Sequence, residues 1–123
     1  MAESLIKDKS YCFALEIIGL YKVLLKQNEF VLSKQLLKSG TSIGANVEEA
    51  LAGQSRADFL SKMSIASNEA RETNYWLRLL KDSEIIPETE VWPLLAESES
   101  IAKILTSIVK TTSQNKNNSK PKI

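Results

Sequence analysis

The chain has 123 residues, of which 43% are hydrophobic and 25% are charged. These proportions are typical of one soluble globular domain, and the length is too short for two comfortable ones. The formal net charge is +1, yet residues 1–109 hold 12 basic and 15 acidic side chains, so the body is mildly acidic. This charge excludes a strongly basic nucleic-acid-binding domain.

The chain contains one cysteine, Cys12, and no histidine. No apolar run has the length of a membrane span or the layout of a signal peptide, so we expect a cytoplasmic protein with no membrane contact. A single cysteine excludes an internal disulfide. Because Cys12 lies between Tyr11 and Phe13, we expect a buried structural thiol.

The first predicted helix spans about residues 4–27. One set of its apolar side chains recurs at steps of three and four residues and predicts the buried stripe. This set is Ala14, Ile17, Ile18, Tyr21, Leu24 and Leu25. Four further apolar residues fall outside the stripe: Phe13, Leu15, Leu20 and Val23. The helix is therefore apolar almost all round, which favours contact with another subunit.

The second predicted helix runs from about Phe30 to Leu51 and ends before Gly53, a residue suited to a helix C-terminus. It contains the run SGTSIGANVEEALAG, from residue 39 to residue 53. The run lacks the lysine and hydroxyl pair of a phosphate-binding loop. Its small residues predict a kink or a tight helix crossing instead. They are Ser39, Gly40, Gly44 and Ala45.

The third predicted helix starts after Ser55, which we expect to cap it together with Asp58. Its core stripe alternates steps of four and three, as in an antiparallel bundle. The stripe is Phe59, Met63, Ala66, Ala70, Thr73, Leu77 and Leu80. Ile65, Trp76 and Leu79 fall together away from this stripe at 100° per residue. We therefore predict that these three side chains lie at an interface between subunits.

The fourth predicted helix follows Pro87, with Glu88 and Glu90 in its first turn, and ends near Lys110. Residues 111–123 read TTSQNKNNSKPKI, with no apolar side chain before Ile123, and predict a disordered basic tail. Four amphipathic helices with short connections predict an all-α fold over residues 1–110. The expected architecture is an up-down-up-down antiparallel four-helix bundle.

No constellation of residues predicts catalysis. The absence of histidine excludes a zinc site and the Glu-x-x-His pattern of di-metal bundles. Glu69 and Glu72 have the spacing to share a hard cation, but solvated or salt-bridged carboxylates are the simpler interpretation. Cys12 has no histidine as a base. We expect a protein that is not an enzyme and uses neither metal nor cofactor.

The segment from Ser33 to Leu80 closely resembles a bacterial family of four-helix-bundle proteins, whose founding members are encoded in intervening sequences of 23S rRNA genes. The resemblance extends over about residues 5–110. Its strongest marks are Gln35-Leu36, Ser42-Ile43, Asn46, Glu49, Arg56, Glu69 and Trp76-Leu77. The resemblance implies a homopentameric ring. It also extends to an accessory protein of diversity-generating retroelements, a markedly basic relative that engages a reverse transcriptase and nucleic acid.

Glu49 lies near a helix C-terminus, where the backbone dipole disfavours negative charge. We expect this carboxylate to find a cation, with Arg56 nearest along the chain and Arg71 or Arg78 as further candidates. A buried polar network of this kind would fix register at little net gain in stability. Its predicted members are Asn46, Glu49, Arg56, Glu69 and Arg71.

Two pairs of lysines lie one helical turn apart, and either mark a contact with a polyanion or form solvated faces. They are Lys22 and Lys26, then Lys34 and Lys38. Two functions remain. The first is a non-enzymatic, homo-oligomeric scaffold or adaptor, pentameric by resemblance, for a macromolecular partner such as another protein. The alternative is a nucleic-acid-binding accessory protein with weak, salt-sensitive binding to RNA or DNA.

Overall fold

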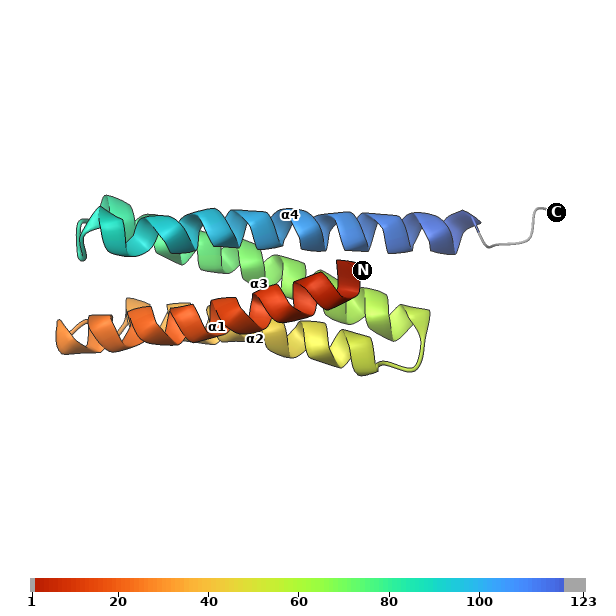
Figure 1. Ribbon diagram of the computed structural model, residues 1–123, viewed down its shortest axis with the longest axis horizontal. Coiled ribbons are helices and arrows are strands. Elements are labelled where there is room, and N and C mark those ends of the chain that lie inside the picture. The colour runs from red at the N-terminus through yellow and green to blue at the C-terminus, as the bar shows by residue number, and fades with distance from the viewer. Residues whose placement is uncertain (1, 119–123) are drawn as a thin grey trace.

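The computed structural model describes residues 2–118, and side chains from residue 3 to residue 114. Four helices follow one another: α1 Ala2–Lys26, α2 Leu32–Ala52, α3 Arg56–Asp82 and α4 Glu88–Asn118. They run alternately up and down as an elongated bundle (Figure 1). Residues 2–118 contain no strand. The predicted all-α antiparallel bundle is confirmed.

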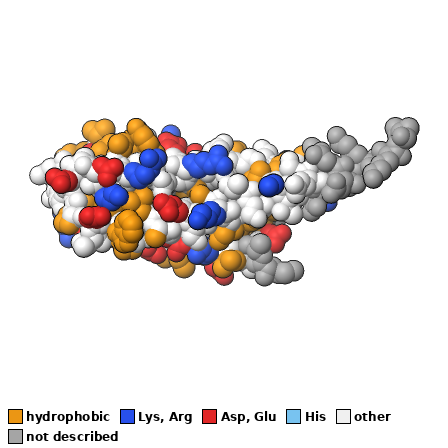
Figure 2. Space-filling model, turned by 90° about the horizontal axis from the view of Figure 1, so that it is seen from above, with side chains coloured by type: hydrophobic (Ala, Val, Ile, Leu, Met, Phe, Trp, Pro, Cys, Tyr) orange, Lys and Arg blue, Asp and Glu red, His pale blue; other side chains and the backbone are white. Residues whose placement is uncertain are grey.

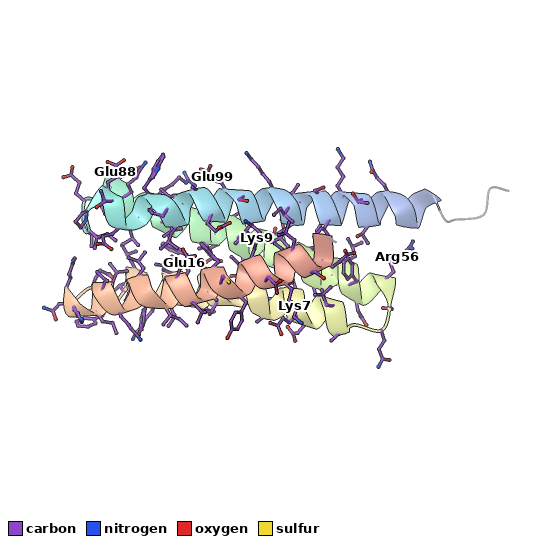
Figure 3. The ribbon with its side chains drawn as sticks, in the orientation of Figure 1. Lys7, Lys9, Glu16, Arg56, Glu88 and Glu99 are labelled. Atoms are coloured by element: carbon purple, nitrogen blue, oxygen red, sulfur yellow. The ribbon has the colours of Figure 1, made fainter. Side chains whose placement is uncertain are left out.

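Each helix packs against its neighbours in sequence, and α4 returns against α1 along a sparser seam. Lys9 of α1 and Glu97 of α4 bridge this last seam through an ion pair of 2.7 Å, with Lys9 between the two helices in Figure 3. The diagonal pairs, α1 with α3 and α2 with α4, make no close backbone approach. None of the helices in this part of the chain is long and apolar enough to cross a membrane.

The buried face of α1 differs from the predicted one. Its core positions are Ile6, Ser10, Phe13, Ile17, Leu20 and Leu24. Phe13 and Leu20, expected outside the stripe, lie in the core, whereas Ile18 and Tyr21 are only half-buried. The prediction failed here because α1 is apolar on nearly every side, so periodicity alone does not select one face.

Cys12 is exposed, and the prediction of a buried thiol is wrong. Phe13 is fully buried, and the preceding residue lies 100° away around the helix axis. Burial of Phe13 therefore turns Cys12 toward solvent, on the same side of α1 as exposed Leu15.

The two glycines of α2 allow a tight crossing with α1, as predicted. A Cβ atom at Gly40 would lie 2.8 Å from two side-chain carbons of Ile17, and one at Gly44 would lie 3.3 Å from the carbonyl oxygen of Ser10. Gly40 and Gly44 are buried, so α1 occupies the space that side chains would need. Exposed Ala45 takes no part in this crossing.

The turn between α1 and α2 is closed by backbone and side-chain hydrogen bonds. Asn28 has a φ of 62°, and the N–H of Glu29 donates to the carbonyl of Leu24 at 2.9 Å, which ends α1 in a Schellman motif. The Glu29 carboxylate then accepts from the N–H groups of Leu32 at 2.8 Å and Ser33 at 2.9 Å. Partial burial raises the pKa of Glu29, but its backbone hydrogen bonds outweigh burial and hold it below the ordinary value.

The start of α3 agrees with the sequence prediction, and the end of α4 differs from it. Ser55 caps α3 as predicted, because its Oγ accepts from the N–H of Asp58 at 3.0 Å. Helix α4 continues to Asn118, past the predicted end at Lys110. Residues 111–118 are polar but contain no glycine or proline to stop helix propagation. The disorder predicted from residue 111 is therefore not found up to residue 118, and residues 119–123 lie outside the described part.

We expect Gly19→Ala and Gly40→Ala to change stability in opposite directions. At Gly19 an added Cβ meets nothing within 4 Å, so alanine should stabilise the helix by about 1 kcal/mol. At Gly40 the added Cβ meets the fixed core side chain of Ile17, and overpacking should cost about 1–3 kcal/mol. Chemical denaturation of both variants measures the difference. Equal stabilisation by the two alanines would contradict the tight crossing.

We expect Glu29→Ala to lower the free energy of unfolding by about 1 kcal/mol at neutral pH, the usual contribution of an N-terminal cap. A carboxylate with a lowered pKa stabilises the fold above its unfolded pKa, and this contribution disappears as pH falls through the folded pKa. The gap between wild type and variant should therefore narrow in acid. Thermal melts at neutral pH and below about pH 4 test this, with Glu16→Ala, an exposed α1 residue in Figure 3, as the matched control.

Candidate functional site

Several residues marked by the family resemblance share one side of α2 or α3, at the seam between these two helices. On α2, residues 35, 38, 42, 46 and 49 recur at helical steps, and on α3 residues 62, 65, 69 and 76 do the same. Lys62 reaches Glu49 across the seam at 3.9 Å. Beneath these side chains, Thr73 Oγ1 donates to Ser39 Oγ at 2.9 Å in the core. We call this surface the α2–α3 seam.

Glu49 does not lie in a buried network within one chain. Its side chain is 60% exposed, and its ion pair with Lys62 is long and solvated, so the pair contributes little to stability. Asn46 turns back to its own helix, where Nδ2 donates to the carbonyl of Ser42 at 2.9 Å and to the Ser42 hydroxyl at 3.0 Å. The predicted network would therefore need a second subunit.

The predicted arginines are separated from one another. Arg56 is the first residue of α3, beside the turn after α2 (Figure 3). Arg71 faces α4, where its Nη2 donates to Thr106 Oγ1 at 3.4 Å. Since residues 69 and 71 differ by 200° around the helix axis, Glu69 and Arg71 cannot share one side of α3. The structure brings Lys62 to Glu49 and places Arg71 on the side of α3 that faces α4.

The α2–α3 seam also contains Glu69, a carboxyl group with a raised pKa. Burial is the main cause that raises its pKa, and repulsion from Glu72 adds to it, while Lys38 on α2 lowers it. Glu72 accepts a hydrogen bond from Trp76 Nε1 at 3.3 Å. Residues 3–114 hold no group of three or more metal-ligating side chains. Of the two carboxylates, Glu72 binds Trp76 and Glu69 lies near Lys38.

The predicted interface residues occupy the outer border of this seam. Ile65 is 39% exposed, whereas Trp76 and Leu79 are half-buried. Trp76 packs partly against the core and meets the ring of Tyr75 edge-on at 5.1 Å. Tyr75 is not among the interface candidates predicted from the sequence. Its position next to Trp76 could have indicated it, and its side chain is exposed.

The four predicted polyanion-binding lysines flank the turn between α1 and α2, and all are exposed: Lys22, Lys26, Lys34 and Lys38. The turn places both pairs near one end of the bundle (Figure 1). Lys38 lies close enough to Glu69 to lower its pKa, which ties that lysine to the α2–α3 seam. The side chains of Lys22, Lys26 and Lys34 are exposed to solvent.

Two comparisons with known proteins give concordant results. The sequence profile of the 23S rRNA-intervening sequence protein family matches residues 2–107. A crystal structure of a protein of unknown function from the S23 ribosomal protein family of Bacteroides thetaiotaomicron is 51% identical in sequence, with a TM-score of 0.86. The match covers 89% of this chain and 99% of that one. No curated protein matches the chain.

We expect Glu69→Gln to raise the melting temperature at neutral pH. A carboxyl whose folded pKa is raised favours the fold most below its unfolded pKa, and that benefit is lost as pH rises through the folded pKa. Glutamine carries no charge, so the variant avoids the destabilisation that the ionised Glu69 carboxylate causes at neutral pH. The difference in melting temperature between variant and wild type should therefore vanish below about pH 4. Thermal melts across this range measure it, with Glu48→Gln on the exposed side of α2 as the control. Destabilisation by Glu69→Gln at neutral pH would show that the carboxylate has a favourable partner.

Proposed function

Because the chain belongs to the 23S rRNA-intervening sequence protein family, we propose that it works without catalysis, as a self-assembling helical bundle that serves as scaffold or adaptor for a macromolecular partner. The inventory of side chains supports this proposal. The chain has no histidine. The single cysteine, exposed on α1, therefore has no histidine to act as its general base.

The observation that carries the proposal is exposed apolar surface on two diagonally opposed helices. On α1, Leu5, Tyr11 and Leu15 are each more than half exposed. On α3, Ile65 and Tyr75 are 39% and 46% exposed. Since α1 and α3 are diagonal in the bundle and their backbones do not approach closely, their outer faces point in different directions. Two different apolar faces suit a heterologous interface, in which the α1 face of one copy meets the α3 face of the next.

A heterologous interface that closes on itself gives a ring. The family resemblance supplies the expected number of five subunits. In such a ring the half-buried Trp76 and Leu79 would border the contact around Ile65. Glu49 would lie where a neighbouring copy's cation can reach it. The ring then presents several copies of each remaining surface to a partner, which is the use of a scaffold.

Light scattering tests this assembly. We expect wild type to give a mass of about five times 13.7 kDa. Leu15→Glu should disrupt the α1 face and Ile65→Glu the α3 face, and each variant alone should be monomeric, because a buried unpaired charge opposes association. An equimolar mixture should form a dimer, since each variant keeps the face that the other lacks.

The exposed position Thr106→Glu on α4 provides a matched control and should assemble as wild type. A monomeric wild type at micromolar concentration would contradict self-assembly. A mixture that stays monomeric would contradict the pairing of α1 with α3 and point to a symmetric interface instead.

A second candidate function, nucleic-acid binding by an accessory protein, is favoured by the four exposed lysines near one end of the bundle. Ring assembly would repeat Lys22, Lys26, Lys34 and Lys38 around one rim. Binding through such a rim would be nonspecific and strongly weakened by salt. The net charge of −3 over residues 1–109, from 12 basic and 15 acidic side chains, opposes a strong site.

A further inference from the structure

A charged groove of about 470 Å³ lies between α3 and α4. Arg71 and Arg78 of α3 and Lys103 of α4 line it, with a single carboxylate, Glu99. It shares Lys103 with an adjoining hollow that continues toward Lys110. The space-filling view from the α4 side shows Lys and Arg side chains along this face, with Asp and Glu side chains among them (Figure 2). We call the two hollows together the α3–α4 groove.

Neutral side chains hold the two guanidinium groups in place. Arg78 Nε donates to Asn74 Oδ1 at 2.9 Å, and Asn74 Nδ2 donates in turn to Ser98 Oγ of α4 at 2.9 Å. The guanidinium of Arg78 also lies 5.8 Å from the ring centre of Tyr75. Arg71 is held by Thr106 at 3.4 Å. Arg78 is thus oriented by two neighbours on α3, whereas Arg71 makes one long contact with α4.

The described side chains leave the groove with a surplus of positive charge. Among residues 3–114, no carboxylate lies within 4.0 Å of Arg71 or Arg78. Four cations, Arg71, Arg78, Lys103 and Lys110, face only Glu99 along the two hollows. This surplus contrasts with the acidic body of the protein, so an anion approaching the bundle is attracted here and repelled over much of the remaining surface.

The residue types of the groove select the class of anion. Planar guanidinium groups match the two-oxygen geometry of a phosphate, and the hydroxyl groups of Thr106 and Ser107 offer further donors. On each helix the cations are seven residues apart, about 10 Å along the axis, which suits an extended polyanion. Ala102 is the one apolar residue lining the two hollows. The aromatic anchors typical of protein partners are therefore missing from their walls.

We propose that the α3–α4 groove binds the phosphodiester backbone of a nucleic acid. This inference rests on the second candidate function, but assigns it to Arg71, Arg78, Lys103 and Lys110 rather than to the lysine rim. Because no base-stacking ring lines the groove, contacts go to phosphates and carry little sequence preference. Glu99, which projects from α4 in Figure 3, weakens the site by repelling phosphate.

Fluorescence anisotropy with a short labelled single-stranded RNA tests the groove, over a salt series starting near 20 mM, where phosphate contacts are strongest. Arg71→Gln/Arg78→Gln should weaken binding about tenfold or more and make the log–log salt slope shallower by roughly 1.4, the value for two lost contacts. Lys34→Gln/Lys38→Gln removes the same charge from the rim and should weaken binding much less. Glu99→Gln should tighten it. Circular dichroism and light scattering establish that each variant keeps its fold and assembly.

Three results would overturn the assignment. An equal or larger loss of RNA affinity in the Lys34→Gln/Lys38→Gln variant would assign nucleic-acid binding to the lysine rim and not to the groove. A wild type that binds no RNA at low salt would remove the second candidate function and the groove site together, with the scaffold role untouched. Stronger competition by an acidic peptide than by RNA of equal charge would assign the groove to a protein partner. Two RNAs of unrelated sequence should bind alike.

Discussion

The tight crossing of α1 over α2 determines how the rest of the bundle is arranged. Gly40 and Gly44 leave no room for side chains because Ile17 and the backbone of Ser10 occupy the space. This contact fixes the rotation of α1, a helix with apolar residues on nearly every side. Once Ile17 faces Gly40, Phe13 and Leu24 turn into the core and the opposite side turns to solvent. Two glycines thus resolve an ambiguity that hydrophobic periodicity leaves open.

The rotation of α1 has consequences for function. It leaves Tyr11 and Leu15 outside, and it places them diagonally across the bundle from Ile65 of α3, since the backbones of α1 and α3 do not approach closely. The α2–α3 seam and the α3–α4 groove then occupy separate faces, because residues 69 and 71 point 200° apart on α3. One bundle thereby presents an apolar pair of faces suited to self-association and a basic face that stays available. The two surfaces share one residue, because Tyr75 belongs to the exposed apolar surface of α3 and also lies beside the guanidinium group of Arg78.

The sequence predicts some parts of this structure well and others poorly, for physical reasons. The helices, the Ser55 cap and the α3 core follow from local patterns that only one arrangement satisfies. The face of α1 and the exposure of Cys12 depend on a contact with α2 that no local pattern contains. Likewise, the α3–α4 groove depends on the register of two helices, which brings Arg71 beside Thr106. The polar composition of residues 111–118 predicts disorder, but this segment contains no glycine or proline and continues α4 to Asn118.

The reaction rate of Cys12 with a thiol reagent tests whether the glycine crossing turns one side of α1 outward for assembly. Cys12 is exposed in the single chain, close to Tyr11 and Leu15. We expect fast labelling of Cys12 in dilute monomer and in a variant with a disrupted α1 face, and protection of Cys12 as wild type assembles at higher concentration. Slow labelling of the folded monomer would contradict the rotation of α1. Equally fast labelling of the assembled protein would contradict a role of this face in assembly.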